Sequence, residues 1–166
     1  MTKAVWSAAA AAATVLFVAS PVFAAGDTKT LNVSATVSAR AKLTLSAAAI
    51  AFGDADPDVT ANIPADTALT VDVKTRTGAA GNVTLTVLSD GDLISGSDSI
   101  TIDKLKWTGG GGLVDGTMSH SSAVSLGSWT GSGNHTGMTQ NYTLVNDWAY
   151  ATGNYHAIVT YTLTAP

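Results

Sequence analysis

The sequence predicts an all-β protein, an antiparallel sandwich of two sheets with immunoglobulin-like Greek-key connections. Outside its Ala-rich first residues the chain is dominated by Thr, Ser, Val, Gly, Asn and Asp, and Glu is absent. Apolar and polar residues alternate in several short runs, and clusters of turn-forming residues separate these runs. Together these features favour strands joined by turns over helices.

The longest alternation extends from Leu31 to Leu45, with apolar residues at odd positions and polar residues at even ones. The inward set at its start consists of Leu31, Val33, Ala35, Val37 and Ala39. A period of two over this length predicts strand, yet the run is about three times the usual strand length of about five to six residues. Either one strand bends across both sheets, or two strands are joined here without a turn.

Further strands are expected at residues 69–74, 83–87, 99–107, 123–129, 141–144 and 155–163. Turns are expected at residues 54–58, 78–82, 89–92, 109–112 and 131–134, which are rich in Gly, Asp, Asn and Ser. Within 99–107 the apolar parity changes, which predicts a bulge near Asp103 and Lys104. The closing strand places one set of residues on a common face: Tyr155, Ala157, Val159, Tyr161 and Leu163.

Residues 1–25 have the features of a cleavable signal peptide. Lys3 supplies the positive start, an apolar run follows over residues 4–19, and Val22-Phe23-Ala24 is a small-x-small cleavage site. A membrane anchor is the alternative, but the run is shorter than a span of about 20 residues and is broken by Pro21. We expect export through the periplasm to the cell surface or medium, and no membrane span after cleavage.

Residues 26–166 are expected to form a single β-sandwich domain, with residues 27–39 as a candidate donor or first strand. The chain has no cysteine, so the core alone must hold this domain. After cleavage, twelve Asp oppose seven Lys and Arg, scattered singly. A mildly acidic surface without a basic patch argues against nucleic acid as a partner.

No group of residues in the sequence predicts catalysis or a cofactor. His120 follows Ser119, and His135 and His156 are the other histidines, but no Gly-x-Ser-x-Gly elbow is present. We therefore expect that the protein is not an enzyme and that these histidines have no chemical role.

Asp54, Asp56 and Asp58 form a D-x-D-x-D run that could offer carboxylate oxygens to calcium. The EF-hand pattern fails, because the sixth position is not Gly and no Glu closes the loop. An Asp-Pro turn between strands is the favoured interpretation.

Five aromatic residues could line a sugar-binding face or fill the core: Trp107, Trp129, Trp148, Tyr142 and Tyr150. Both interpretations suit large amphipathic rings.

The stretch from Lys42 to Pro57, with Phe52-Gly53 and Asp56-Pro57, resembles the opening of spore coat protein U-type domains and of archaic chaperone-usher pilins. The closing segment Gly153 to Leu163 is similar to the Gly-x-Tyr final strand of that group. The cysteine pair common in the group is absent here. The resemblance implies an extracellular structural subunit that a periplasmic chaperone delivers to a surface fibre, pilus or coat, with no catalytic residues.

The leading functional hypothesis is a subunit that assembles with copies of itself or related subunits by β-strand addition. Residues 27–39 would enter a neighbouring chain, or else form an ordinary first strand of their own domain. The alternative function is a secreted carbohydrate or cell-wall binding module that uses an aromatic face.

Overall fold

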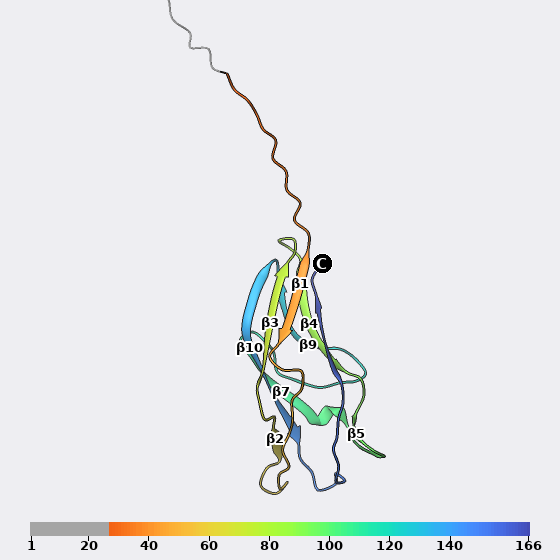
Figure 1. Ribbon diagram of the computed structural model, residues 1–166. Helices are drawn as coiled ribbons and strands as arrows, with labels where there is room; N and C mark the ends of the chain where they lie inside the picture. Colours follow the sequence, from red (N-terminus) through yellow and green to blue (C-terminus); the bar gives the residue numbers. More distant parts are fainter. Residues whose placement is uncertain (1–26) are drawn as a thin grey trace, which may run out of the picture. The chain divides into compact units, whose positions relative to one another are not determined.

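The computed structural model describes residues 27–166 (Figure 1); the predicted signal peptide lies outside the described residues. The elements in chain order are β1 (Arg40–Leu45), β2 (Asn62–Pro64), β3 (Leu69–Arg76), β4 (Asn82–Ser89), β5 (Leu93–Ser95), β6 (Asp98–Ile100), a 3-10 turn (Ile102–Lys104), β7 (Leu105–Gly110), β8 (Gly116–Thr117), β9 (Val124–Thr130), β10 (Gly133–Val145) and β11 (Val159–Thr164). All of these elements belong to one compact unit, Thr36–Pro166. Within residues 27–166 no helix is long and apolar enough to cross a membrane.

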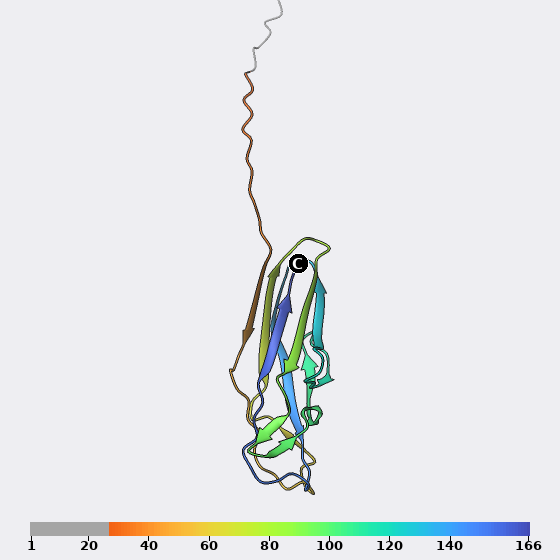
Figure 2. The same cartoon turned by 90° about the vertical axis from the view of Figure 1, so that its right-hand side faces the viewer.

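Two antiparallel sheets pack against each other, which confirms the predicted all-β sandwich (Figure 2). The larger sheet has the order β1-β3-β10-β7-β8, and β2 pairs with β10 at its end. The smaller sheet has the order β11-β4-β9, and β5 and β6 form a separate hairpin. The immunoglobulin-like connection pattern stays a prediction.

The core lies between the inner faces of the two sheets. Residues at alternate positions of β3 and β4 are fully or almost fully buried, as period-two alternation requires. They are Leu69, Val71 and Val73 on β3, and Val83, Leu85 and Val87 on β4. Each such side chain contributes about 1.5–3 kcal/mol by leaving water, so the core can hold the fold without disulfides.

The strands predicted at 69–74, 83–87 and 123–129 are confirmed as β3, β4 and β9. The run predicted at 99–107 is divided into β6 and β7 by the 3-10 turn Ile102–Lys104. The irregularity predicted at Asp103 and Lys104 is therefore present, but it is a helical turn and not a β-bulge. Lys104 N donates to Thr101 O at 3.0 Å, which closes this turn.

β10 is longer than predicted, because it begins at Gly133 and not at Asn141. Its register against β3 shifts between His135 and Met138, where Gly137 adopts a φ of 69°. The predicted turn at 131–134 is thus confined to its first two residues. The 109–112 segment likewise contributes Gly109 and Gly110 to β7 before the chain turns.

The alternating run 31–45 forms a strand only from Arg40 to Leu45. Residues 27–39 are in no strand. The side chains of Leu31, Val33 and Val37 are 86%, 85% and 69% exposed. The expectation of a continuous strand over 31–45 is therefore wrong for the single chain. The predicted closing strand is also shorter, since Tyr155 and Ala157 precede β11 while keeping the same half-buried alternation.

Candidate functional site: an open edge between the two sheets

The strands β1 and β11 are the end strands of their two sheets. They lie next to each other on one side of the sandwich, and no hydrogen-bonded ladder joins them (Figures 1 and 2). An end strand carries backbone N–H and C=O groups along its free side that no neighbouring strand satisfies. This side of the sandwich is therefore open to a further strand.

The ladder between β11 and β4 fixes which backbone groups of β11 point outward. Asp90 N donates to Ile158 O at 2.9 Å, and these two residues are in the register that continues as Thr160 with Leu88. In an antiparallel ladder, hydrogen-bonded and non-hydrogen-bonded pairs alternate. The even residues of β11 therefore bond to β4, and the backbone groups of the odd residues face the open edge: Val159, Tyr161 and Leu163.

β1 shows the same alternation of bonded and free backbone groups. Ser46 N donates to Thr70 O at 2.9 Å, in the register that pairs Lys42 with Lys74. The even residues of β1 thus bond to β3, and the backbone groups of Ala41, Leu43 and Leu45 point to the free side.

Apart from Ala41, which is exposed, the residues with free backbone groups are also those with core-directed side chains. Leu43 and Leu45 on β1 and Val159, Tyr161 and Leu163 on β11 are half-buried and pack against the core. Their remaining apolar surface is what a further strand would cover. One added strand would thus satisfy the free backbone groups and cover the apolar side chains of the same residues.

The opposite side of the sandwich is bridged. Val114 N donates to Leu126 O at 2.9 Å, which ties the segment before β8 to β9. Leu126 is fully buried and Leu113 is 6% exposed. The two sides of the domain therefore differ, and the open one is the side of β1 and β11.

Charge distinguishes the two open strands. β1 carries Arg40 and Lys42, which are exposed, whereas residues 157–166 contain no charged side chain. Charged residues on an edge strand hinder the addition of another strand. The β11 edge is thus the better acceptor.

A buried polar network lies under this edge. The Tyr142 and Tyr161 hydroxyls are 2.6 Å apart, and Tyr161 Oη donates to Gln140 Oε1 at 2.7 Å. Burial raises the pKa of Tyr161 to about 12, while the hydrogen bond from Tyr142 lowers it in part. Burial raises the pKa of Tyr142, and the neighbouring Tyr161 and the hydrogen bond between the two hydroxyls raise it further. Gln140 lowers the pKa of Tyr142 in part. Gln140 is fully buried, and its Nε2 has no partner among the described residues.

The three aspartates considered for calcium are not assembled into an ion site. Within residues 27–166 no group of three or more His, Cys, Asp or Glu side chains is placed to hold a metal. Asp56 instead shapes a turn: its Oδ1 accepts from Asp58 N at 2.9 Å, and its carbonyl accepts from Thr60 N at 2.8 Å. Asp58 Oδ1 accepts from Trp148 Nε1 at 3.1 Å.

The aromatic residues do not form one face. Trp107 and Tyr142 are 2% and 3% exposed, with ring centroids 5.9 Å apart in the core. Trp129 stacks on His135 with the ring centroids 4.8 Å apart. Trp148 is 67% exposed in the loop after β10.

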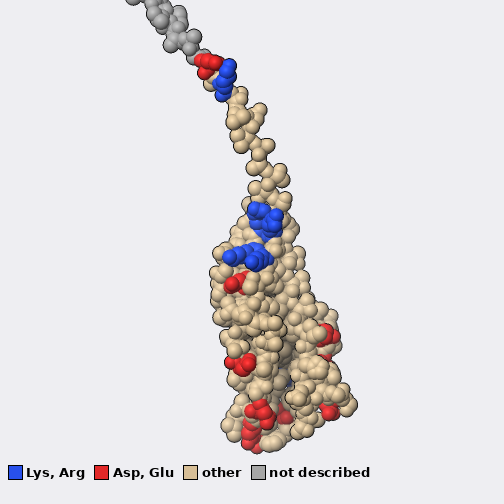
Figure 3. Space-filling model, viewed as in Figure 1, with Lys and Arg blue, Asp and Glu red and all other residues tan. Residues whose placement is uncertain are grey.

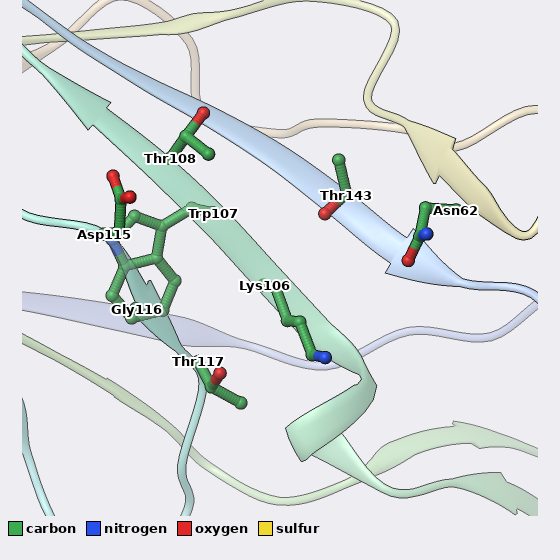
Figure 4. Close-up of a pocket in the computed structure, with 8 residues that line it drawn as sticks. All are labelled: Asn62, Lys106, Trp107, Thr108, Asp115, Gly116, Thr117 and Thr143. Carbon is green, nitrogen blue, oxygen red and sulfur yellow. The ribbon is translucent and has the colours of Figure 1, made fainter.

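An open hollow of about 600 Å³ lies beside Trp107 (Figure 4). It is lined by Asn62, Lys106, Trp107, Thr108, Asp115, Gly116, Thr117 and Thr143. The indole Nε1 of Trp107 donates to Val114 O at 2.9 Å. Since this ring is buried, its face is not available for stacking on a sugar.

The histidines are not arranged as a triad. His120 Nε2 lies 3.8 Å from Asp92 Oδ1, but Asp92 also accepts from Ile102 N at 2.9 Å. Ser119 Oγ pairs with Ser121 Oγ at 3.2 Å and not with the imidazole. A nucleophile bonded to its base, which triad chemistry requires, is not formed by these residues.

A scan against protein-family models found no match to the chain. A search of the curated proteins also found no similar sequence.

Proposed function

We propose that this protein is a secreted, non-enzymatic structural subunit that assembles into a surface fibre, pilus or coat by β-strand addition. The single observation that supports this most is the free side of β11. There the outward backbone groups and the half-buried apolar side chains belong to the same residues, Val159, Tyr161 and Leu163.

The donor in this proposal is residues 27–39 of another copy. This segment is exposed and in no strand in the single chain, where Ser38 O accepts from Arg76 Nε at 2.9 Å, and its odd residues are all apolar from Leu31 to Ala39. An added strand of this kind bonds to the acceptor through its backbone and places alternate side chains against the acceptor core. Since donor and acceptor lie at different places on the same chain, each added copy offers a new edge, so the contact is heterologous and propagates as a fibre.

The experiment separates donor from acceptor. A chain with Val33→Asp and Val37→Asp cannot donate, because a carboxylate would be buried without a partner at a cost of several kcal/mol. It should stay folded and monomeric by thermal melting and size-exclusion chromatography. A fluorescent peptide of residues 27–39 should bind this monomer.

Matched peptides complete the test. A peptide with Thr36→Asp should bind as well as the native peptide, since the side chain at position 36 faces away from the core. A peptide with Val33→Asp and Val37→Asp should not bind. If the chain with both Val changes loses its own thermal stability, or if the native peptide fails to bind, strand addition between chains is wrong and residues 27–39 act within their own domain or not at all.

A further inference from the structure

One end of the β1–β3 pair carries a cluster of cations, which we call the basic end. It consists of Arg40, Lys42, Lys74 and Arg76, in which Arg40 lies opposite Arg76 and Lys42 opposite Lys74. All four are exposed, and none takes part in the ion pairs found among residues 27–166. Like charges directly opposite each other on a sheet are destabilising. The domain therefore keeps an unfavourable local arrangement that an anionic partner would relieve.

The other end of the domain is acidic, and we call it the acidic tip. It consists of Asp54, Asp56, Asp58 and Asp147, all exposed, in the loops before β2 and after β10. Residues 43–73 and 107–166 contain no Lys or Arg. In Figure 3 a group of blue residues lies near the start of β1, and a group of red residues lies at the end where Figure 1 places β2.

The acidic tip is a fixed surface with apolar side chains on it. Asn146 Nδ2 donates to Ala55 O at 2.9 Å and to Thr60 O at 3.0 Å, which joins the two loops. Trp148 Nε1 donates to Asp58 Oδ1, which holds the indole in place. Val59 and Trp148 are nevertheless 81% and 67% exposed. Exposed apolar residues with a charged rim are typical of a protein-binding surface.

The two ends are related by the direction of β11. The segment before β11 follows the acidic tip, and β11 ends beside the basic end, where Thr77 Oγ1 donates to Pro166 O. A donor strand antiparallel to β11 therefore enters at the basic end of its acceptor and leaves at the acidic tip. Because residue 39 is followed directly by Arg40, the donor then delivers its own basic end to that tip. A parallel donor would bring two basic ends together.

We infer that the acidic tip of one subunit docks on the basic end of the next copy of the same chain, as a second contact in the polymer. This inference rests on the proposed function. Exposed charges of this kind are screened by salt, so they act on encounter and orientation more than on the strength of the finished contact. The elongation rate should therefore fall about tenfold or more at high salt, while formed polymers persist.

Charge reversal at each end tests this docking in the full exported chain. Arg40→Glu, Lys42→Glu and Lys74→Glu together leave three anions and one cation at the basic end, which makes it acidic. Asp54→Lys, Asp58→Lys and Asp147→Lys together leave three cations and one anion at the tip, which makes it basic. Each triple variant alone should elongate about tenfold or more slowly by light scattering, because like charges meet at every junction. A mixture of the two should recover the native rate, since every junction again joins opposite charges. Thermal melts check that both variants are folded.

The donor peptide distinguishes the two proposals. The peptide of residues 27–39 includes neither end, so it should bind the Val33→Asp, Val37→Asp chain equally well with or without the charge reversals. If the peptide binds but the reversals leave elongation unchanged, or the mixture does not recover, docking of the two ends is wrong and strand addition stands. If the peptide does not bind, the proposed function itself fails.

Discussion

The hydroxyl of Tyr142 on β10 lies 2.6 Å from that of Tyr161 on β11, and this hydrogen bond joins the two sheets behind the open edge. Its direction follows from the acceptor next to it. Gln140 Oε1 can only accept, so the single proton of Tyr161 goes to Gln140 and Tyr142 must donate to Tyr161. Tyr161 is therefore the central member of the network.

Phenylalanine at the two tyrosine positions should have unequal effects. Tyr161→Phe removes the hydrogen bond to the side-chain oxygen of fully buried Gln140 and should lower the free energy of unfolding by about 1–3 kcal/mol. Tyr142→Phe leaves Tyr161 bonded to Gln140 and should cost about 0.5–1.5 kcal/mol. Urea unfolding of both variants measures the difference. Equal losses would contradict the assigned direction.

Alkaline pH should weaken the fold through the same pair. The folded-state pKa of Tyr161 is raised to about 12 and that of Tyr142 is raised as well, whereas the pKa of an unfolded tyrosine is about 10. The neutral hydroxyls thus stabilise the fold fully below about pH 10, and this stability is lost as pH rises through the folded pKa. Thermal melts from pH 8 to 12 should show a steeper decline for the native chain than for a Tyr142→Phe, Tyr161→Phe variant. Parallel declines of the two chains would show that ionisation of Tyr142 and Tyr161 does not weaken the fold.

Gly116 should be intolerant of a side chain. A Cβ at this position would lie 2.3 Å from Cζ2 of Trp107, a ring that is 2% exposed in the core. Gly116→Ala should therefore destabilise the domain by about 1–3 kcal/mol through overpacking. Gly53→Ala is the matched control, because nothing lies within 4 Å of its Cβ position. Chemical denaturation of both variants checks this, and equal stabilities would show that Trp107 can move aside.

The exported protein should begin at Ala25 or Gly26. The small residues before this point satisfy the rule for signal peptide cleavage. Mass spectrometry of protein recovered from the periplasm or cell surface gives the mass of the mature chain. A chain that retains Met1 would contradict the export hypothesis.

The sequence predicts the central strands well, because burial of one face imposes period two on residues such as Val71, Val73, Leu85 and Val87. It does not predict the first half of β10. There Gly133 and Gly137 carry no side chain and the register shifts beside His135, so no alternation marks the strand.

The open edge could be predicted only in part. The alternation at residues 31–39 shows that this segment suits a strand, but a pattern of side chains does not say which strand it pairs with. The phase of the β11 ladder is also beyond the sequence. It depends on register with β4, and this register decides whether Val159, Tyr161 and Leu163 direct their backbone groups inward or outward.

Residue-resolved amide hydrogen exchange on β11 tests strand addition most directly, because adjacent residues serve as controls for one another. In the monomeric Val33→Asp, Val37→Asp chain, the amides of Thr160 and Thr162 should be protected by β4, while those of Tyr161 and Leu163 should exchange rapidly. In polymers of the native chain, Tyr161 and Leu163 should become protected as well. If these two amides exchange as rapidly in the polymer as in the monomer, no strand is added at β11 and the account is wrong.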